Sequence, residues 1–143
     1  RRPGGHRARG GQRRPQHTAV IRGIGADLCQ ISRMEDLVRD RAFLERYFDP
    51  GEQAYILARG VMAAASMAGH FAAKEAFAKA AGKGFYGIAP RDIVVCHDEG
   101  SAPYYRLGPS AQQAMAEKGA ACSHLSISHE GGLALAFCVL EGD

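Results

Sequence analysis

The stretch GHFAAKEAFAKAAGKG, residues 69–84, decides the fold of this chain. Alanine and other strong helix formers fill it, and Gly82 and Gly84 mark the place where a helix ends. Because the alanine-rich pattern begins near Val61, we expect one long helix over residues 61–81. Its small side chains would let neighbouring backbone pack closely around it.

A strand is predicted upstream, in VIRGIGADL (residues 20–28), which is short and rich in branched side chains. Gly23 and Gly25 interrupt it, and such glycines mark a close approach to the backbone. They are not a dinucleotide-binding fingerprint, because Leu28 stands where the third glycine would fall. We expect a neighbouring chain or a ligand to approach here.

The remaining elements follow from capping and turn signals. Ser32, with Glu35 at the capping-box spacing, predicts a helix over residues 32–47. Pro50 predicts a second helix start, running to about residue 59. Strands at 91–97 and 103–107, a helix at 109–118, and strands at 124–128 and 133–140 around the hairpin signal Glu130-Gly131-Gly132 complete the series. This order predicts an α+β fold with an antiparallel sheet packed on the long central helix.

The bulk composition predicts one soluble domain. The chain has 143 residues and a hydrophobic fraction of 46%, both ordinary for a single globular unit. No apolar run approaches the roughly 20 residues that a membrane-spanning helix needs, so we expect a soluble protein, and the cysteine usage predicts a cytoplasmic location. The four cysteines form no CxxC pair, so they give no zinc or redox motif and predict small buried side chains in a reducing compartment.

The basic charge belongs to residues 1–17, which hold six arginines and no acid. Without those six, 12 basic residues face 15 acidic ones, a balance of −3 in place of the overall +3. We expect residues 1–17 to be a disordered Arg-rich tail and residues 18–143 to be the folded domain. The tail could be a transit peptide, a nucleic-acid-binding arm or an extension without a role. A small nucleic-acid-binding protein is therefore the alternative function, although the acidic body argues against it.

Glu75 and Lys79 are four residues apart and share one face of the predicted long helix. An isolated pair of this kind is usually a solvated ion pair. Phe71 lies one turn earlier on the same stripe, so the stripe is not purely solvated. A carboxylate and an ammonium beside a packed surface could serve a metal ion and an anionic ligand together.

Two further residues stand at element ends. Asp27 closes the glycine-bearing strand, where it is either a turn residue or one of the one or two carboxylates that Mg²⁺ takes beside waters and substrate phosphates. His129 ends a strand before a glycine-rich turn, where it is either a structural hydrogen-bonding residue or part of a site. No acid and nucleophile flank it at a spacing typical of a hydrolase triad.

Four motifs in order change the interpretation of these residues. RGIGADLCQISRME (22–35), YFDPGEQAY (47–55), GHFAAKEAFAKAAGKG (69–84) and HLSISHEGGLALAFCVLE (124–141) resemble the successive motifs of the holo-(acyl carrier protein) synthases, in the 4′-phosphopantetheinyl transferase superfamily. The resemblance covers about residues 20 to 141. It implies that superfamily's fold and transfer of 4′-phosphopantetheine from coenzyme A to a serine of apo-acyl carrier protein, releasing adenosine 3′,5′-bisphosphate.

The resemblance also implies roles for single residues. Asp27 and Glu75 would hold Mg²⁺, and Glu75 would take the proton of the attacking serine. Lys79 would contact the pyrophosphate, and His129 would lie beside the nucleotide or its phosphates. Lys74 would face the edge of the ligand. An inactive relative that acts only as an interaction partner is disfavoured, because Asp27, Glu75 and Lys79 are intact.

Partners follow from the same resemblance. Acyl carrier proteins are acidic, and Arg33 stands where the family docks them; the carrier could serve fatty-acid or polyketide synthesis. Family members of this length are commonly homotrimers with active sites between protomers, which would also suit the glycine-bearing strand.

This chain departs from the family pattern at two places. His70 replaces a common Arg that could pair with a coenzyme A phosphate, so this contact would be weaker and pH-dependent. Gly100-Ser101-Ala102-Pro103 replaces a Gly-Lys-Pro turn with one extra residue and no charge.

Overall fold

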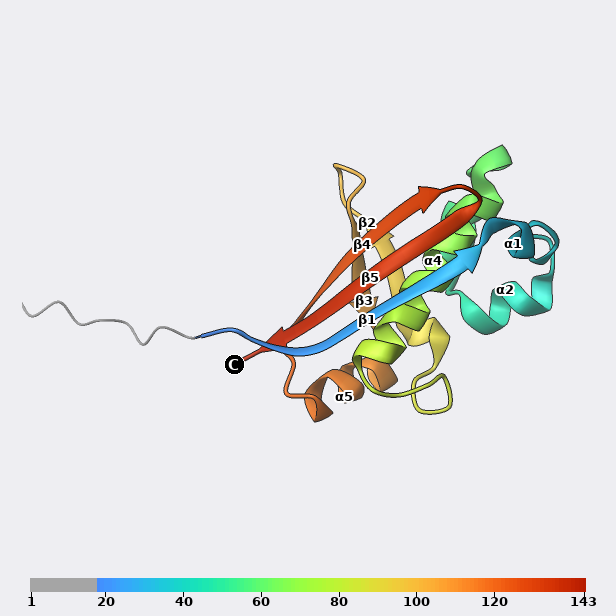
Figure 1. Cartoon of the computed structure of the whole chain (residues 1–143). Coiled ribbons are helices and arrows are strands. Elements are labelled where there is room, and N and C mark those ends of the chain that lie inside the picture. Colours follow the sequence, from blue (N-terminus) through green and yellow to red (C-terminus); the bar gives the residue numbers. More distant parts are fainter. Residues whose placement is uncertain (1–17) are drawn as a thin grey trace, which may run out of the picture.

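The computed structural model describes residues 18–143 (Figure 1). The predicted tail, residues 1–17, lies outside the described residues, and so do the functions considered for it. The elements in chain order are β1 (Val20–Gln30), α1 (Ile31–Leu37), α2 (Arg41–Tyr47), α3 (Pro50–Leu57), a 3₁₀ turn (Gly60–Met62), α4 (Ala63–Ala80), a second 3₁₀ turn (Pro90–Asp92), β2 (Ile93–His97), β3 (Pro103–Leu107), α5 (Pro109–Glu117), β4 (Cys122–Glu130) and β5 (Leu133–Gly142). The α+β class is confirmed.

Helix α4 is the centre of the fold, as its composition predicts. Its alanines are almost all buried, and Met67 and Phe77 are buried with them. It ends at Gly82, whose positive φ of 70° is the left-handed conformation typical of a helix C-terminus. Burying each large apolar side chain here stabilises the fold by about 1.5–3 kcal/mol.

The strands form two antiparallel sheets. The larger has the order β1-β5-β4, and β2 pairs with β3 in a separate hairpin. Figure 1 shows the three long strands lying across α4. Along β5, Ala134, Ala136, Cys138 and Leu140 are buried against α4, while the residues between them face away from the helix. The strict alternation explains why the sheet has one buried face.

The β4–β5 hairpin closes through Gly131 and Gly132, which have φ values of 57° and 76°. Two consecutive positive φ angles are the signature of a tight two-residue hairpin turn, which glycine adopts without strain. The tip also reaches the N-terminal part of the chain, because the N–H of Ile31 donates to the carbonyl of Gly132 at 2.9 Å. The hairpin therefore fixes the point where β1 becomes α1.

The prediction of one continuous helix over residues 32–47 is wrong. The chain forms two helices there, α1 and α2, with a break at residues 38–40. Asp40 causes the restart by accepting a hydrogen bond from the N–H of Phe43 at 3.1 Å. The predicted cap at Ser32 is also wrong. The N-cap is Gln30, which makes no side-chain cap bond, because β1 runs directly into α1.

A capping box is present at α3. Asp49 accepts from the N–H of Glu52 at 2.8 Å, and the Glu52 carboxylate accepts from the N–H of Asp49 at 3.2 Å. Pro50 occupies the first turn, as predicted. Within residues 18–143, no single helix is long and apolar enough to cross a membrane; α3 and residues 60–80 meet that criterion only together, bent by 119°.

Candidate active site

Strand β1 lies directly on α4 because it carries glycines at the contact. A Cβ added to Gly23 would lie 2.1 Å from the carbonyl oxygen of Ala80, and one added to Gly25 would lie 2.1 Å from that of Ala76. The expectation that a neighbouring chain or ligand approaches these glycines is therefore wrong. The partner is the alanine-rich helix of the same chain, and the contact brings Asp27 against α4.

Asp27 and Lys79 meet at this junction. The Lys79 ammonium lies 2.9 Å from the Asp27 carboxylate and donates to the carbonyl of Ala26 at 3.0 Å. The Lys79 side chain is 54% exposed and that of Asp27 is 18% exposed. The ion pair is thus accessible to a ligand on one side and anchored by packing on the other.

Glu75 completes the group, one helical turn before Lys79. Burial raises the pKa of its carboxyl, and the negative charge of Asp27 raises it further, while Lys79 and Arg33 oppose the shift. The two carboxylates are therefore electrostatically coupled across β1 and α4. A divalent cation placed between them would relieve this repulsion, so the donor set fits a hard cation with oxygen ligands.

Arg33 extends from α1 toward the same group. Its guanidinium carbon lies 5.3 Å from the centre of the Phe71 ring, and its charge lowers the pKa of Glu75. The side chain remains exposed. The Phe71 ring therefore holds the Arg33 guanidinium near Glu75 through a cation–π contact. This contact accounts for the aromatic residue on the Glu75–Lys79 stripe.

His129 and His70 lie together elsewhere, in a cavity of about 490 Å³. The cavity is lined by residues of α3, α4, the β2–β3 turn and the β4–β5 hairpin. The Nε2 of His129 lies 2.9 Å from the carbonyl oxygen of Ala65, which accepts from it. That bond spans α4 and the hairpin tip and orients the imidazole at the cavity wall. Asp27, Glu75 and Lys79 do not line this cavity.

His70 is buried inside a stack of rings. The ring of Tyr55 lies 5.4 Å from that of His70 and 4.4 Å from that of His97, all nearly parallel. The Nδ1 of His70 lies 3.4 Å from Glu52, a long contact, and neither ring nitrogen has a hydrogen-bond partner within the described residues. Both nitrogens are buried, so ring stacking and the approach to Glu52 hold the imidazole at the cavity wall.

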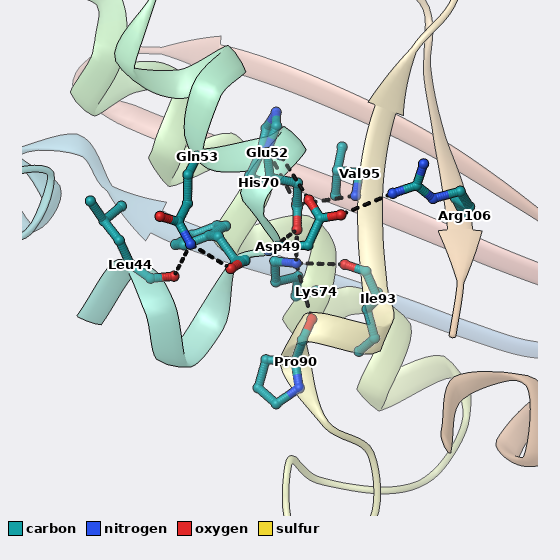
Figure 2. Close-up of polar contacts among 11 residues, drawn as sticks. Leu44, Asp49, Glu52, Gln53, His70, Lys74, Pro90, Ile93, Val95 and Arg106 are labelled. Carbon is teal, nitrogen blue, oxygen red and sulfur yellow. Dashed lines mark hydrogen bonds and ion pairs between the residues drawn. The ribbon is translucent and has the colours of Figure 1, made fainter. Parts of the chain in front are cut away.

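Lys74 does not face a ligand edge, so that placement is wrong. It is fully buried, and its ammonium binds Glu52 at 2.7 Å and donates to the carbonyls of Pro90 at 3.0 Å and Ile93 at 2.6 Å (Figure 2). Burial lowers the pKa of Lys74, while Glu52 opposes the shift. Helical spacing alone could not separate Lys74 from Lys79, because the directions of the two side chains depend on what covers α4.

Glu52 is the residue whose role the sequence did not indicate. One carboxylate oxygen binds Lys74 and the other accepts from the N–H of Val95 at 3.1 Å (Figure 2). Burial alone would raise its pKa, but His70, Lys74 and Val95 together hold the pKa below its usual value. A polar residue in a capping box gave no signal of this burial. Glu52 ties α3, α4 and β2 together beneath the cavity.

The turn after β2 also reaches the cavity, through Ser101 and Pro103. Ser101 has a φ of 66°, and its N–H donates to the carbonyl of Asp98 at 3.0 Å. The Asp98 carboxylate accepts from the N–H of Ala102 at 2.9 Å. The extra residue of this turn is thus accommodated by a left-handed serine at the cavity rim.

Comparison with known proteins relates this chain to one family. Residues 23–138 match the family model described as the 4′-phosphopantetheinyl transferase superfamily. The holo-[acyl-carrier-protein] synthase of Treponema denticola is 44% identical over 123 residues, covering 86% of this chain and all of the relative.

Solved structures agree. The synthase of Neisseria meningitidis superposes with a TM-score of 0.76 at 35% identity, covering 85% of this chain and 98% of that one. The synthase of Helicobacter pylori, solved in complex with coenzyme A, superposes with a TM-score of 0.69 at 32% identity, covering 82% and 98%.

Proposed function

The chain belongs to the 4′-phosphopantetheinyl transferase superfamily, and on this basis we propose that it is a transferase that modifies apo-acyl carrier protein. It moves the 4′-phosphopantetheine group of coenzyme A to a serine. The serine oxygen bonds to the β-phosphorus, the bond from that phosphorus to the bridging oxygen breaks, and adenosine 3′,5′-bisphosphate leaves. The proton of the serine passes to a base. The names of the relatives support this reaction, as does the coenzyme A bound to the Helicobacter pylori synthase.

The observation that carries the catalytic assignment is the junction of β1 and α4. It brings Asp27 of β1 next to Glu75 and Lys79 of α4, although Asp27 and Lys79 are 52 residues apart in the sequence. Asp27 and Glu75 would hold Mg²⁺, which supplies positive charge to the pyrophosphate oxygens when it is bound. Burial raises the pKa of Glu75 and the negative charge of Asp27 raises it further, and a cation between the two carboxylates would relieve their repulsion.

Lys79 would stabilise the leaving group. Its ammonium is exposed beside Asp27, where it can move from that carboxylate to a pyrophosphate oxygen. A hydrogen bond of 3.0 Å to the carbonyl of Ala26 would keep it at the junction. An ammonium held by a carbonyl in this way costs little reorganisation when charge develops on the phosphate.

Glu75 is the proposed general base. It is partly buried, so it holds a proton more readily than an ordinary glutamate. Its position beside Asp27 and Lys79 supports this role, because the attacking hydroxyl and the phosphate would meet at that group. Proton transfer is direct or through one water.

The cavity behind the β4–β5 hairpin is the proposed nucleotide site. His129 is oriented by Ala65, and the buried imidazole of His70 lies at its wall. His70 would contact a phosphate or the base more weakly than the Arg common in relatives, and more strongly when protonated. Lys74 and Glu52 are positioning residues that hold α4 beneath this wall.

Arg33 is the proposed docking residue for the carrier protein. It is exposed and held over Phe71, close to the catalytic group. An acidic partner that contacts Arg33 would deliver its serine next to Glu75. Arg33→Glu is expected to raise the carrier-protein KM much more than the coenzyme A KM, and the difference should shrink at high salt. Equal effects on both constants would contradict docking.

A homotrimer with active sites between protomers is the proposed assembly. The sheet face turned away from α4 exposes large apolar side chains on β1 and β5, with exposed fractions of 61% for Ile24, 60% for Leu28, 41% for Leu135 and 44% for Phe137. A contiguous apolar face of this kind is typical of a subunit contact.

A cytoplasmic location is also proposed, because it fits the unpaired state of Cys29, Cys96, Cys122 and Cys138.

The test is direct. The protein is incubated with coenzyme A, Mg²⁺ and an apo-acyl carrier protein, and the carrier is weighed by mass spectrometry. The carrier should gain the mass of phosphopantetheine, and a chelator should prevent the gain. Glu75→Gln should abolish it, whereas near-normal turnover of Glu75→Gln at saturating Mg²⁺ would sink the assignment of the base. A carrier of unchanged mass with the wild-type enzyme and several acidic carriers would overturn the proposed reaction.

A further inference from the structure

Three different metal-ligand side chains gather where β4 begins and β5 ends. Cys122 lies directly opposite Glu141 in the antiparallel register, and His124 is two residues along β4 on the same face. The Nε2 of His124 lies 2.7 Å from the Glu141 carboxylate, and the Sγ of Cys122 lies 3.4 Å from that oxygen and 3.8 Å from the imidazole nitrogen. Among residues 18–143, this is the one group of three such side chains whose ligand atoms lie within 4.8 Å of one another.

The spacing of these atoms fits tetrahedral coordination. Bonds of about 2.0–2.3 Å to a tetrahedral zinc place its ligand atoms about 3.3–3.8 Å apart. The two separations that involve the Cys122 sulfur already have these values. Only the distance from His124 to Glu141 would have to widen, by about 0.6 Å, which a small side-chain rotation provides.

We propose that Cys122, His124 and Glu141 bind a divalent cation of the zinc class, with a fourth position open to water. Thiolate, imidazole and carboxylate are the three ligand types that zinc takes in proteins, and a set containing sulfur disfavours Mg²⁺. Cysteine spacing gave no zinc motif because only one of the ligands is a cysteine. Cys122 and His124 come from β4, whereas Glu141 comes from β5, nineteen residues after Cys122.

This site is separate from the proposed catalytic centre. Asp27 faces α4 and lies opposite Ala136, whereas Glu141 is five residues further along β5 on the other face of the sheet. The distance along the strand is about 17 Å. The His124 and Glu141 side chains are 57% and 30% exposed, so a cation can enter from solvent. A bound cation would join the ends of β4 and β5.

The test uses Co²⁺ as a spectroscopic probe with the full-length, metal-free protein. One equivalent of Co²⁺ should produce a near-ultraviolet sulfur-to-cobalt charge-transfer band, and Zn²⁺ should displace it. Cys122→Ser should abolish the band, and His124→Ala should weaken Co²⁺ binding at least about 10-fold, since even changes outside the ligand shell cost about 10–100-fold.

Two matched variants make the result specific. Cys96→Ser removes another cysteine and should leave the band intact, and Asp27→Asn removes the proposed magnesium ligand and should also leave it intact. In wild type, Zn²⁺ should raise Tm in a concentration-dependent way, and Cys122→Ser should lose this response. Absence of a sulfur band at stoichiometric Co²⁺, or a band that survives in Cys122→Ser, would overturn the site. Neither result bears on phosphopantetheine transfer.

Discussion

Two glutamates in this protein have pKa values that their surroundings shift in opposite directions. Glu75 is partly buried beside another acid, so its pKa lies above the usual value. Glu52 is more deeply buried, yet its contacts with His70, Lys74 and Val95 bring its pKa below the usual value. One group is prepared to accept a proton, and the other is fixed as an anion. The number of compensating donors decides between these outcomes.

The influence of Asp27 on Glu75 can be measured on the free protein. Asp27→Asn removes a negative charge that favours the protonated form of Glu75, so the pKa of Glu75 should fall. Part of the elevation should remain, because burial is its larger cause. Carboxyl-carbon NMR titration of metal-free protein measures this, with Asp36→Asn as a matched control that leaves Glu75 unchanged. An unaltered Glu75 pKa in Asp27→Asn would show that the two acids are not coupled.

The buried ion pair predicts a large and unequal response to mutation. Lys74→Met leaves the Glu52 carboxylate buried without its ammonium and should destabilise the protein by about 3–5 kcal/mol in urea unfolding. Lys83→Met, which breaks the exposed pair with Glu117, should cost no more than about 1 kcal/mol. Adding Glu52→Gln to Lys74→Met should recover part of the loss, since no unpaired charge remains. Equal losses for Lys74→Met and Lys83→Met would contradict the buried pair.

The lowered pKa of Glu52 also predicts how the stability of the protein depends on pH. The folded pKa of Glu52 is lowered, so its stabilising contribution is fully present above the unfolded value of about 4.3. The contribution is lost as pH falls through the lower folded pKa. Unfolding free energies of wild type and Glu52→Gln should therefore converge in acid and separate toward neutral pH.

Among the elements, the contact of β1 with α4 requires the most specific sequence. Two glycines on the strand meet two alanine carbonyls on the helix at distances that exclude any side chain. The contact sets both the position of the strand and the placement of Asp27 two residues later. Stability and the proposed catalytic role of Asp27 therefore depend on the same close contact between the two backbones.

Gly25→Ala should test this dependence. The added Cβ would lie 2.1 Å from the Ala76 carbonyl oxygen, so β1 must shift away from α4. We expect a loss of about 1–3 kcal/mol in unfolding free energy, together with reduced transfer activity. Gly84→Ala is the matched control, because nothing lies within 4 Å of its added Cβ, and it should change stability by less than about 1 kcal/mol. A Gly25→Ala enzyme with wild-type stability would show that β1 is not held as described.

Sequence patterns predicted the elements that repeat a strong local signal and missed those set by distant contacts. The alanine content gave α4, and the glycine pair gave the β4–β5 hairpin. The break before α2 depends on one capping aspartate, Asp40, and the start of α1 depends on the hairpin tip more than a hundred residues away. Likewise, the motifs named Asp27, Glu75 and Lys79, but only the packed α3 and β2 show why Lys74 is interior.

At the scale of the whole molecule, residues 18–143 leave one face of the large sheet without a covering layer. Apolar side chains of β1 and β5 point away from α4 over this face. Opposite it, α4 and the smaller sheet bury the core, so the molecule is two-sided in polarity. A two-sided molecule with an apolar face is expected to assemble through that face.

Phe137→Glu should therefore disrupt the proposed trimer. A charge at the middle of the apolar face would be buried without a partner in the assembly, so size-exclusion chromatography with light scattering should detect monomer. Tyr86→Glu, at an even more exposed aromatic in the loop after α4, should leave the assembly intact. If active sites lie between protomers, Phe137→Glu also loses transfer activity. A wild-type protein that elutes as a monomer would remove the basis for this assembly.

The order of strands in the large sheet has a consequence for biosynthesis. β5 is the central strand and the last of the described elements to be synthesised, and it pairs with β1 over residues such as Val20 and Gly142 that lie at opposite ends of the described chain. Until β5 emerges, β1 and β4 have no hydrogen-bonding neighbour, and the alanine face of α4 has no cover on that side. The large sheet therefore cannot form until β5 has been synthesised, and before that a nascent chain presents open strand edges that are prone to aggregation.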